Sequence, residues 1–391
     1  MKKVISENKI PIKLWTDNIE ENALVQANNI ANLPFAFRHV AIMPDVHTGY
    51  GVPIGGVFAA KKVIVPNAVG KDIGCGMIAV KTNIKDIDES TIKLIMSDIR
   101  SFIPVGLNQN HSEPQDESLM PDVSIVANIK DSIVEREYNK ACRAVSTLGS
   151  GNHFHELQKD EEGYLWVMIH SGSRNLGSRV ADYYDKIAKK LNEKWFSGVP
   201  KRSDLAFLPI DSEEGNAYLQ EMKYCLEFAQ ANRDEMLRRT LIIIGSYFDL
   251  ENDLDIVNIH HNYAAWENHF GENVIVHRKG ATRARLGEIG IIPGSQGTCS
   301  YIVKGLGNKE SFESCSHGAG RTMSRSKART TLNLEEEVKK MNDLGIVHGI
   351  RNQNDLDEAS SAYKDIEEVI ANELDLIEPI VKLRPIAVIK G

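Results

Sequence analysis

The sequence predicts a single α+β domain over residues 1–391, with mixed and largely antiparallel sheets. Short apolar runs punctuated by glycines indicate strands joined by turns, and longer amphipathic stretches between them indicate helices. No linker rich in proline, serine or charge divides the chain, and no internal repeat is visible. Candidate metal-binding and catalytic residues are spread from residue 45 to residue 317, so most of the chain must fold together if they meet.

The composition is that of an ordinary globular protein and excludes several classes. Apolar residues make up 42% of the chain, yet no apolar run approaches the ~20 residues of a membrane helix. The two N-terminal lysines precede no long apolar stretch, which argues against a signal peptide. Five cysteines without framework spacing indicate reduced thiols and a cytoplasmic location. The net charge of -8 argues against indiscriminate nucleic-acid binding but permits a local basic face.

The first half of the chain is expected to alternate strands and helices. An extended segment covers 3–15, and an amphipathic helix over 19–32 ends before a proline. A strand beginning at residue 40 leads into a glycine-rich loop that contains Asp45 and His47. The other elements expected here are strands within 57–80, including one over 63–69, a helix over 86–101, a polar surface loop over 108–121 and a helix over 134–145.

The second half contains one long helical stretch, over 216–250. Its apolar residues recur at heptad-like spacing, and we interpret this stripe as core packing. A strand over 165–169 ends at His170, and a strand over 257–263 carries His260 and His261. The other elements expected here are a helix over 179–195, short strands within 274–303, a loop over 312–321, helices over 332–344 and 362–374, and a strand over 386–389.

A glycine-rich turn over residues 70–76 offers two metal ligands. Asp72 and Cys75 are three residues apart, and the flanking glycines allow a turn sharp enough to bring a carboxylate and a thiolate together. This mixed hard and soft donor pair suits a divalent transition metal better than calcium or magnesium. A buried, inert cysteine beside a capping aspartate is the alternative interpretation of the turn alone.

Four histidines stand at the ends of apolar runs beside small residues. Each one alone is more often a hydrogen-bonded structural residue, but together with Asp72 and Cys75 they form a donor set for manganese, zinc, iron or cobalt. The set exceeds one tetrahedral site, so we expect two metals bridged by the Cys75 sulfur. The four are His153, His170, His261 and His317.

Two glycine loops and one basic window suggest an anionic ligand. The loops, over 293–297 and 317–321, present backbone amides that could hold a phosphate, although each could equally be a tight turn. The window from Arg278 to Arg329 holds ten Lys or Arg and three Glu, which indicates either an RNA or nucleotide surface or an ordinary solvated face.

These motifs together resemble the RtcB family of RNA-splicing ligases, from about residue 10 to residue 391. The matching strings occur in the family's order, and CSHGAGR and GKDIGCG are the most specific. They are MPDVHTGYG, VGKDIGCGM, GSGNHFHE, HSGSR, HHNY, RKGATRA, GIIPGSQG, GLGNKESFESCSHGAGR, AYKDI and the final Lys-Gly.

The resemblance implies a ligase that uses GTP and two Mn²⁺ ions. It implies that His317 forms a covalent histidine-GMP, that GMP passes to an RNA 3′-phosphate, and that a 5′-hydroxyl RNA end then displaces it. A 2′,3′-cyclic phosphate is first hydrolysed to a 3′-phosphate. The RNA ends are thus the expected partners, an activating protein partner is left open, and no membrane is involved.

The resemblance also assigns the site residues. One metal would take Asp72, Cys75 and His153, and the other Cys75, His170 and His261. Four further residues would hydrogen-bond to the metal ligands or contact RNA: Asp45, His47, Arg174 and Arg321. The guanylate would contact Asn152, His153, Phe154, His155, Glu156, His261, Asn262, Pro293, Gly294, Ser295, Gln296, Ser300, His317, Gly318, Ala319, Gly320 and Lys390.

Some residues depart from the family pattern, but none of the departures removes the predicted nucleophile or a predicted metal ligand. They concern the preference for RNA ends, and they leave tRNA splicing and RNA repair as two branches. They are Thr48, Tyr50, Ser150, His155, Asn175, Gln296 and Ser360. Two other functions stay open from the residues alone: a dinuclear metal phosphoesterase and an RNA-end binder that does not ligate.

Overall fold

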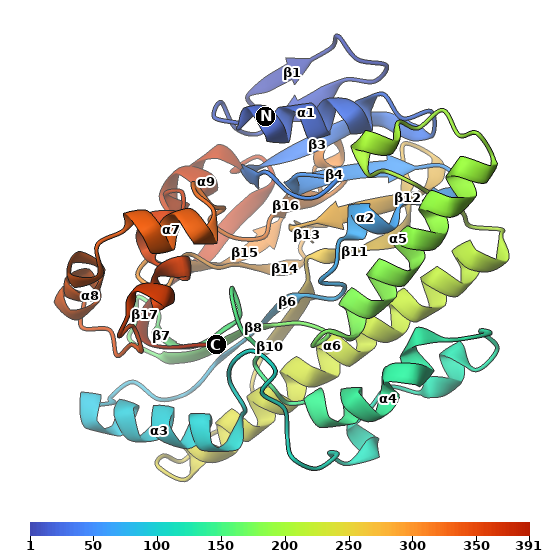
Figure 1. The fold of residues 1–391 in the computed structure, drawn as a ribbon. Helices are drawn as coiled ribbons and strands as arrows, with labels where there is room; N and C mark the ends of the chain where they lie inside the picture. Colours follow the sequence, from blue (N-terminus) through green and yellow to red (C-terminus); the bar gives the residue numbers. More distant parts are fainter.

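The computed structural model describes residues 1–391 and contains two main sheets with helices packed around them (Figure 1). The first sheet has six strands in the order β1-β2-β3-β4-β12-β11, and all its neighbours are antiparallel except the parallel pair β2 and β3. Its strands are β1 (Lys3–Ile5), β2 (Ile12–Leu14), β3 (Ala36–His47), β4 (Ile54–Ala60), β12 (Glu272–Lys279) and β11 (Asn262–His269).

The second sheet has seven antiparallel strands and supplies most of the predicted ligand and nucleotide residues. Its order is β10-β6-β8-β7-β17-β15-β14. The strands are β10 (Ile256–His260), β6 (Gly76–Lys81), β8 (Leu165–Ser171), β7 (Phe154–Lys159), β17 (Ile377–Lys390), β15 (Ser300–Gly305) and β14 (Ile289–Ile292). Two small antiparallel pairs complete the strands: β13 (Ala281–Arg283) with β16 (Ser314–Ser316), and β5 (Val63–Ile64) with β9 (Leu208–Pro209). The prediction of mixed, largely antiparallel sheets is confirmed.

The helices cover the sheets and differ greatly in length. The longest, α6, begins at a Ser212 cap whose hydroxyl accepts a hydrogen bond from the Gly215 amide, with two glutamates in the first turn. The helices are α1 (Glu21–Ala31), α2 (Pro66–Val69), α3 (Glu89–Phe102), α4 (Ile133–Ala144), α5 (Leu176–Lys194), α6 (Glu213–Gly245), α7 (Arg325–Thr331), α8 (Leu334–Asp343) and α9 (Ile366–Asn372). Short 3₁₀ segments occur at Glu117–Leu119, Val123–Val126, Lys201–Ser203, Lys309–Ser311, Gln353–Glu358 and Ser360–Ala362.

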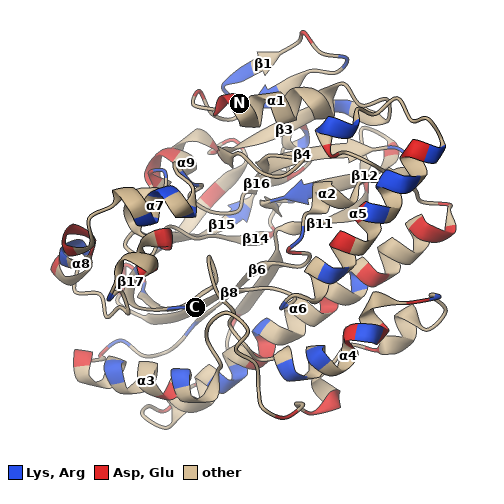
Figure 2. Cartoon of the chain, viewed as in Figure 1, with Lys and Arg blue, Asp and Glu red and all other residues tan.

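Alternation along β3 explains how the six-stranded sheet buries both faces. Val40 and Ile42 pack with α1 in one core, whereas Ala41 and Met43 pack with residues of α9 in another. Helix α6 joins two further cores, since its first half packs against α4 and α5 and its second half against α3 and the seven-stranded sheet. Acidic and basic side chains are interspersed along α3, α5 and α6 (Figure 2). No helix in the structure has both the length and the apolar character that a membrane crossing requires.

Several expected elements differ in the structure. The strand expected over 257–263 is two strands, β10 and β11, which belong to different sheets and leave His261 between them. The strand expected over 63–69 ends at Ile64, because Pro66 starts the short helix α2 and proline is favoured in a first helical turn. The final strand extends from Ile377 to Lys390, well beyond the expected 386–389. Its register shifts between Pro385 and Ala387, which shows how a strand can accommodate a proline that lacks an amide donor.

Candidate active site

The predicted site residues meet at a cleft of about 1200 Å³. Loops at the ends of β6, β7, β8 and β11 form one side of it, and the two glycine loops and the end of β17 contribute the other residues. Predicted residues that line the cleft are His47, Asp72, Asn152, His153, Phe154, Glu156, His170, Arg174, His261, Asn262, Pro293, Gly294, Ser295, Gln296, His317, Gly318, Ala319, Gly320, Arg321 and Lys390. Cys75, Asp45 and Ser300 lie behind this lining and are almost fully buried.

The Cys75 sulfur stands between two imidazoles. Its Sγ lies 3.5 Å from His153 Nε2 and 3.2 Å from His170 Nε2, and His170 Nε2 lies 3.4 Å from His261 Nε2. Ligand atoms that share one metal at about 2.0–2.3 Å are about 3.3–3.7 Å apart in tetrahedral geometry. The spacing of these four atoms therefore fits metal coordination on both sides of the sulfur.

Hydrogen bonds fix the ring orientation of two of these histidines. His153 Nδ1 donates to the Leu148 carbonyl at 2.8 Å, and His170 Nδ1 donates to the Asn152 carbonyl at 3.0 Å. Each Nε2 is then left with its lone pair facing Cys75, which is the usual arrangement for a metal-binding histidine. Burial lowers the pKa of His170 to about 3, so its imidazole is neutral and able to bind a metal.

The thiol and the carboxylate of the 70–76 turn have different surroundings. Burial and then the charge of Asp72 raise the pKa of the Cys75 thiol, so the thiolate needs a cation beside it. Asp72 opens into the cleft, and desolvation raises its pKa despite nearby arginines and lysines. Cys75, His170 and His261 form a compact trio whose ligand atoms lie within 4.8 Å of one another, and Asp72 lies outside that trio.

Two polar residues of α6, which the sequence analysis did not single out, support the loops that carry the predicted ligands. The fully buried Arg233 donates to the carbonyls of Gly74 and Ser171 at 2.9 and 3.1 Å. Its neighbour Asn232 donates to Ser171 Oγ and to the Gly172 carbonyl, both at 3.1 Å. These bonds attach one helix to the backbones next to Cys75 and His170.

His317 is paired with Asp45 across 272 residues of sequence. Asp45 Oδ2 accepts hydrogen bonds from His317 Nδ1 at 2.6 Å and from the His317 amide at 3.0 Å. Burial would raise the pKa of Asp45, but the charge and hydrogen bonds of His317 outweigh it and lower the pKa. Nδ1 is thus occupied, and Nε2 is the ring nitrogen free to react.

The backbone around this pair is tightly fitted. A Cβ on Gly320 would lie 2.1 Å from the Asp45 carbonyl oxygen, and the φ of +75° at this residue also favours glycine. Lys364 Nζ donates to the carbonyls of Pro44 and Val46, on both sides of Asp45, at 3.0 and 2.6 Å. The His317 ring is 4.8 Å from the His261 ring, which places the pair directly beside the metal trio.

Alternate residues of β7 divide between the cleft and the core. Phe154 and Glu156 face the cleft, whereas His155 is fully buried and bonds to Thr240 Oγ1 of α6 at 2.8 Å. Side chains in a strand alternate between its two faces, so His155 does not reach a ligand in this cleft. The structure therefore does not place the His155 side chain where the guanylate contact was predicted.

Glu156 lies deep in the cleft and is oriented by a neighbour. Gln158 Nε2 donates to Glu156 Oε2 at 2.6 Å and to Ser300 Oγ at 3.2 Å. Burial raises the pKa of Glu156 to about 7, although the Gln158 bond and the charge of Lys390 oppose the shift. Lys390 Nζ lies 5.5 Å from the centre of the Phe154 ring, so a cation and an aromatic face adjoin the carboxyl group.

Arg321, a predicted RNA contact, is largely engaged within the protein. Its guanidinium donates to Glu358 Oε2 at 2.9 Å, to the Asp357 and Met323 carbonyls and to Tyr363. Arg325, which sequence reasoning did not single out, makes one bond to Glu358 through Nε and lines the cleft beside Gly151. Arg325 therefore has more donors left for a phosphate than Arg321 has.

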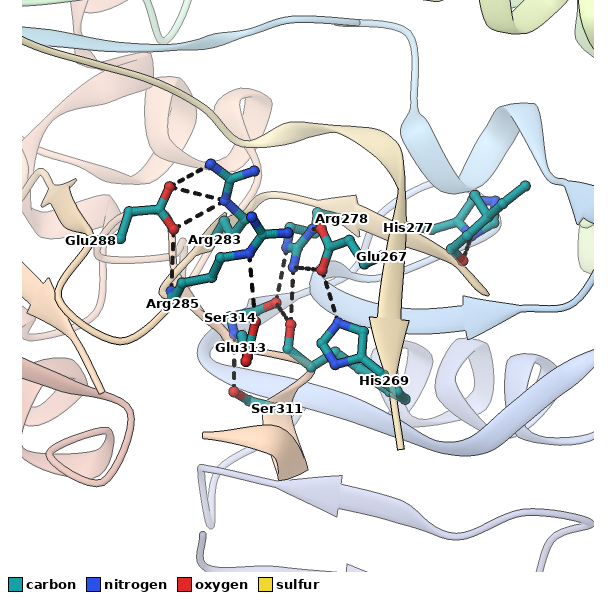
Figure 3. Close-up of polar contacts among 12 residues, drawn as sticks. Glu267, His269, His277, Arg278, Arg283, Arg285, Glu288, Ser311, Glu313 and Ser314 are labelled. Atoms are coloured by element: carbon teal, nitrogen blue, oxygen red, sulfur yellow. Dashed lines mark hydrogen bonds and ion pairs between the residues drawn. The ribbon is translucent and has the colours of Figure 1, made fainter. Parts of the chain in front are cut away.

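Three arginines of the basic window are paired with glutamates inside the protein (Figure 3). Arg278 is fully buried and forms a two-bond pair with Glu267, and Arg283 bonds to Glu288. Arg285 lies 3.6 Å from Glu313. These three arginines therefore form neither a free RNA surface nor an ordinary solvated face, because their charges are paired within the fold.

The same region contains a second group of potential metal ligands, formed by Glu267, His269 and Glu313. Glu267 already accepts bonds from Arg278 and from His269 Nε2, the latter at 2.8 Å (Figure 3). The guanidinium supplies the positive charge that the buried carboxylate needs. We interpret this group as a buried ion-pair network.

Comparison with known proteins gives a consistent family assignment. Residues 26–391 match the family model described as "tRNA-splicing ligase RtcB". The chain is 37% identical to the RNA-splicing ligase RtcB of Escherichia coli K12, with 99% of each chain covered. It is 32% identical to the tRNA-splicing ligases RtcB of Nanoarchaeum equitans and Thermococcus kodakarensis, covering 98% of this chain and 95% of each relative. The chain therefore belongs to the RtcB family.

Proposed function

We propose that this protein is a GTP- and Mn²⁺-dependent RNA ligase with one catalytic domain over residues 1–391. It would join RNA ends bearing a 2′,3′-cyclic phosphate or a 3′-phosphate to ends bearing a 5′-hydroxyl. The observation that carries the proposal is the placement of the Asp45–His317 pair 4.8 Å from the His261 ring of the metal trio, within one cleft. The names of the relatives, RNA-splicing and tRNA-splicing ligases, support the same reaction class.

Two Mn²⁺ ions would share Cys75, one with Asp72 and His153 and the other with His170 and His261. The spacing of the four sulfur and nitrogen atoms and the neutral His170 imidazole fit this assignment. When bound, the ions would neutralise phosphate charge and stabilise the Cys75 thiolate.

His317 would be the nucleophile of the first step. Asp45 holds Nδ1 and leaves Nε2 free, so Nε2 would attack the α-phosphate of GTP and pyrophosphate would leave. The GMP group would next pass from His317 to an RNA 3′-phosphate, after any cyclic phosphate has been opened by water. The 5′-hydroxyl of the second RNA end would then attack that phosphate, forming the phosphodiester and releasing GMP.

Guanine selectivity would come from the β7 wall of the cleft. The Glu156 carboxylate would accept hydrogen bonds from the N–H edge of guanine, and Phe154 would lie against the base. Lys390 and the backbones of 152–153, 293–296 and 317–320 would complete the nucleotide site, together with Asn262 and Ser300. Adenine lacks the matching N–H groups and would leave the buried carboxylate unpaired, which disfavours it strongly.

The decisive experiment is the formation of a covalent adduct with α-labelled GTP and Mn²⁺. The protein should retain label after denaturation, lose it in mild acid as a phosphoramidate does, and carry it on His317 after proteolytic mapping. His317→Ala should take up no label and seal no 3′-phosphate end, yet it should join an RNA already activated with GMP. His348→Ala, a histidine outside the cleft, is the matched control and should behave like the wild type.

The same assay separates the alternatives. A dinuclear phosphoesterase would release phosphate without retaining label, and an RNA-end binder would do neither. Ligation of 3′-phosphate ends by His317→Ala in the presence of GTP would contradict the covalent mechanism. The proposal also includes a cytoplasmic location, a role in either tRNA splicing or RNA repair, and an activating partner. These three points are to be tested in cells.

A further inference from the structure

A second buried carboxyl group, that of Glu373, contacts Ser316, the last residue of β16 and the residue before His317. Glu373 follows α9 directly and is 0% exposed. Its Oε2 accepts a hydrogen bond from the Ser316 amide at 2.8 Å, while the next amide, that of His317, donates to Asp45 Oδ2 at 3.0 Å. Two consecutive amides are thus held by carboxyl groups from two different elements.

The backbone of Glu373 is itself fixed by the turn between α9 and β17. Its amide donates to the Ile370 carbonyl, and its carbonyl accepts from Leu376 and Ile377 at 2.7 and 3.1 Å. The position of the side chain is therefore set by the fold, and the contact with Ser316 can transmit that position to His317.

Two buried oxygens at this contact have no other hydrogen-bond partner. They are Glu373 Oε1 and the hydroxyl oxygen of Ser316, and the Ser316 hydroxyl interacts with the Glu373 side chain. An ionised carboxylate only accepts hydrogen bonds, whereas a neutral carboxylic acid also donates one. One hydrogen bond between these oxygens satisfies both, with either the Ser316 hydroxyl or a protonated Glu373 as its donor, so the contact holds Glu373 against Ser316 and the surrounding charges decide which group donates.

The charges around Glu373 favour that proton. Asp45 of β3 and Asp375 of the following turn face it with negative charge, and the buried Cys315 thiol lies nearby. Burial, and then these charges, raise the pKa of Glu373 to about 8 despite the Ser316 bonds. His317 lowers the pKa of Asp45, so the two neighbouring carboxyl groups differ in charge: Glu373 keeps its proton and Asp45 is ionised.

We propose that Glu373, as a neutral carboxylic acid, is a positioning residue for His317. By fixing the amide and hydroxyl of Ser316, it keeps the imidazole against Asp45. Ionisation of Glu373 would add a second negative charge beside Asp45 and make the Ser316 hydroxyl the donor of the side-chain contact. The inference rests on the proposed role of His317 as the nucleophile.

The first test measures the proton on Glu373 without using activity. Unfolded, this carboxyl titrates near 4.5, and in the folded protein it keeps its proton to about pH 8. The folded state binds more protons in this interval, so the group makes the protein less stable as pH rises from about 4.5 to about 8. In Glu373→Gln this contribution is absent, and the Tm of the variant minus that of the wild type should increase across the interval and then level off.

The control for this test is Glu368→Gln, which removes a carboxyl from the exposed face of the same helix. Its Tm should follow the wild type at every pH. A constant difference between Glu373→Gln and wild type would show that Glu373 is ionised throughout, and it would overturn the proposal.

The second test measures the single-turnover rate of histidine-GMP formation with saturating GTP and Mn²⁺, between about pH 6.5 and 9. The wild-type rate should fall above about pH 8. Glu373→Gln, whose amide can accept from the Ser316 amide and donate to its hydroxyl, should stay within about twofold of the wild type below pH 8 and lack that fall. Glu373→Met should lose about tenfold in rate at every pH, with an unchanged KM for GTP, because the contact holds the nucleophile and not the nucleotide.

A Met variant with the wild-type rate, or a Gln variant with the wild-type pH dependence, would refute the positioning role. The proposed ligase function and the proposed role of Glu373 can be contradicted by different results. A wild type that forms no histidine-GMP would contradict the proposed function, whereas the Tm comparison would still report the proton on Glu373.

Discussion

At the residue scale, the site depends on which nitrogen of each histidine is occupied. Carbonyl oxygens hold Nδ1 of His153 and His170, and a carboxylate holds Nδ1 of His317. The same ring atom, Nε2, is thereby left free in all three residues, which suits the proposed metal coordination by two of them and the proposed nucleophilic attack by the third. The hydrogen-bond partner of Nδ1 therefore selects the tautomer of each ring. This selection would allow metal binding and nucleophilic attack to occur in neighbouring residues of one cleft.

Replacing Asp45 with Asn should reduce histidine-GMP formation by about 10²- to 10⁴-fold. The amide cannot balance positive charge on the imidazole as it forms its bond to phosphorus, and it no longer selects one tautomer. Rapid-quench measurement with labelled GTP reports the rate. Binding of Mn²⁺ should be unchanged, because Asp45 contacts none of the metal ligands. A rate close to wild type would exclude Asp45 as the partner of the nucleophile.

The pH dependence of GTP use should report Glu156. Burial raises the pKa of its carboxyl to about 7, and only the ionised form accepts both guanine N–H groups. The ionised fraction grows with pH, so kcat/KM for GTP should rise as pH passes through about 7, before the fall that the proposed role of Glu373 predicts above about pH 8. Glu156→Gln should lower kcat/KM and remove this rise. Equal labelling of the wild type by ATP and GTP would contradict the assignment of Glu156 to guanine recognition.

At the scale of elements, the sequence could predict the strand ends and glycine turns that carry the site residues. It could not predict which residues of other elements hold these turns in place. His153, His170 and His261 could be singled out because each follows or ends an apolar run beside small residues. Asn232 and Arg233 fall within a helical stretch whose periodicity indicated packing, and only the folded chain shows them against Gly74 and Ser171. The partners of Glu373 and Lys364 also lie far away in sequence, so no local pattern could reveal them.

The role of α6 as a support can be tested with Arg233→Met. The substitution keeps a long side chain but leaves the carbonyls of Gly74 and Ser171 without a donor, so the free energy of unfolding should fall by at least about 2 kcal/mol. The affinity for Mn²⁺ should fall as well, because the loops next to Cys75 and His170 lose their anchor. Denaturant unfolding and metal titration measure the two effects.

Arg238→Met on the same helix is the matched control, since the Arg238 side chain is largely exposed and Glu235 keeps its pair with Arg239. It should change the free energy of unfolding by no more than about 1 kcal/mol. If Arg233→Met and Arg238→Met bound Mn²⁺ equally well, α6 would have no role in shaping the metal site.

At the scale of the whole molecule, the ligands come from three separate parts of the chain. Cys75 precedes β6, His153 and His170 belong to the β7–β8 region, and His261 separates β10 from β11. Metal bound to all of these proposed ligands would link the three parts and stabilise the folded state but not the unfolded chain. Metal binding and folding should therefore be coupled.

Removal of metal should consequently lower the Tm. At a Mn²⁺ concentration 100 times Kd the gain is about 2.7 kcal/mol for one site, and a chelator should abolish it. Cys75→Ala should show no Tm increase with Mn²⁺ and no bound manganese by elemental analysis, whereas Cys142→Ala, a buried thiol outside the cluster, should match the wild type. Two manganese ions retained by Cys75→Ala would refute the bridging sulfur.

The pairing of Asp45 with His317 across 272 residues has a kinetic consequence. Contacts between residues so distant in sequence close late, because the loop entropy must be overcome before they form. During refolding from denaturant, helices such as α6 should recover their circular dichroism first, and the capacity to accept GMP should return afterwards. A newly made chain would then pass through a period in which it is compact and has formed its native helices but cannot yet react with RNA ends.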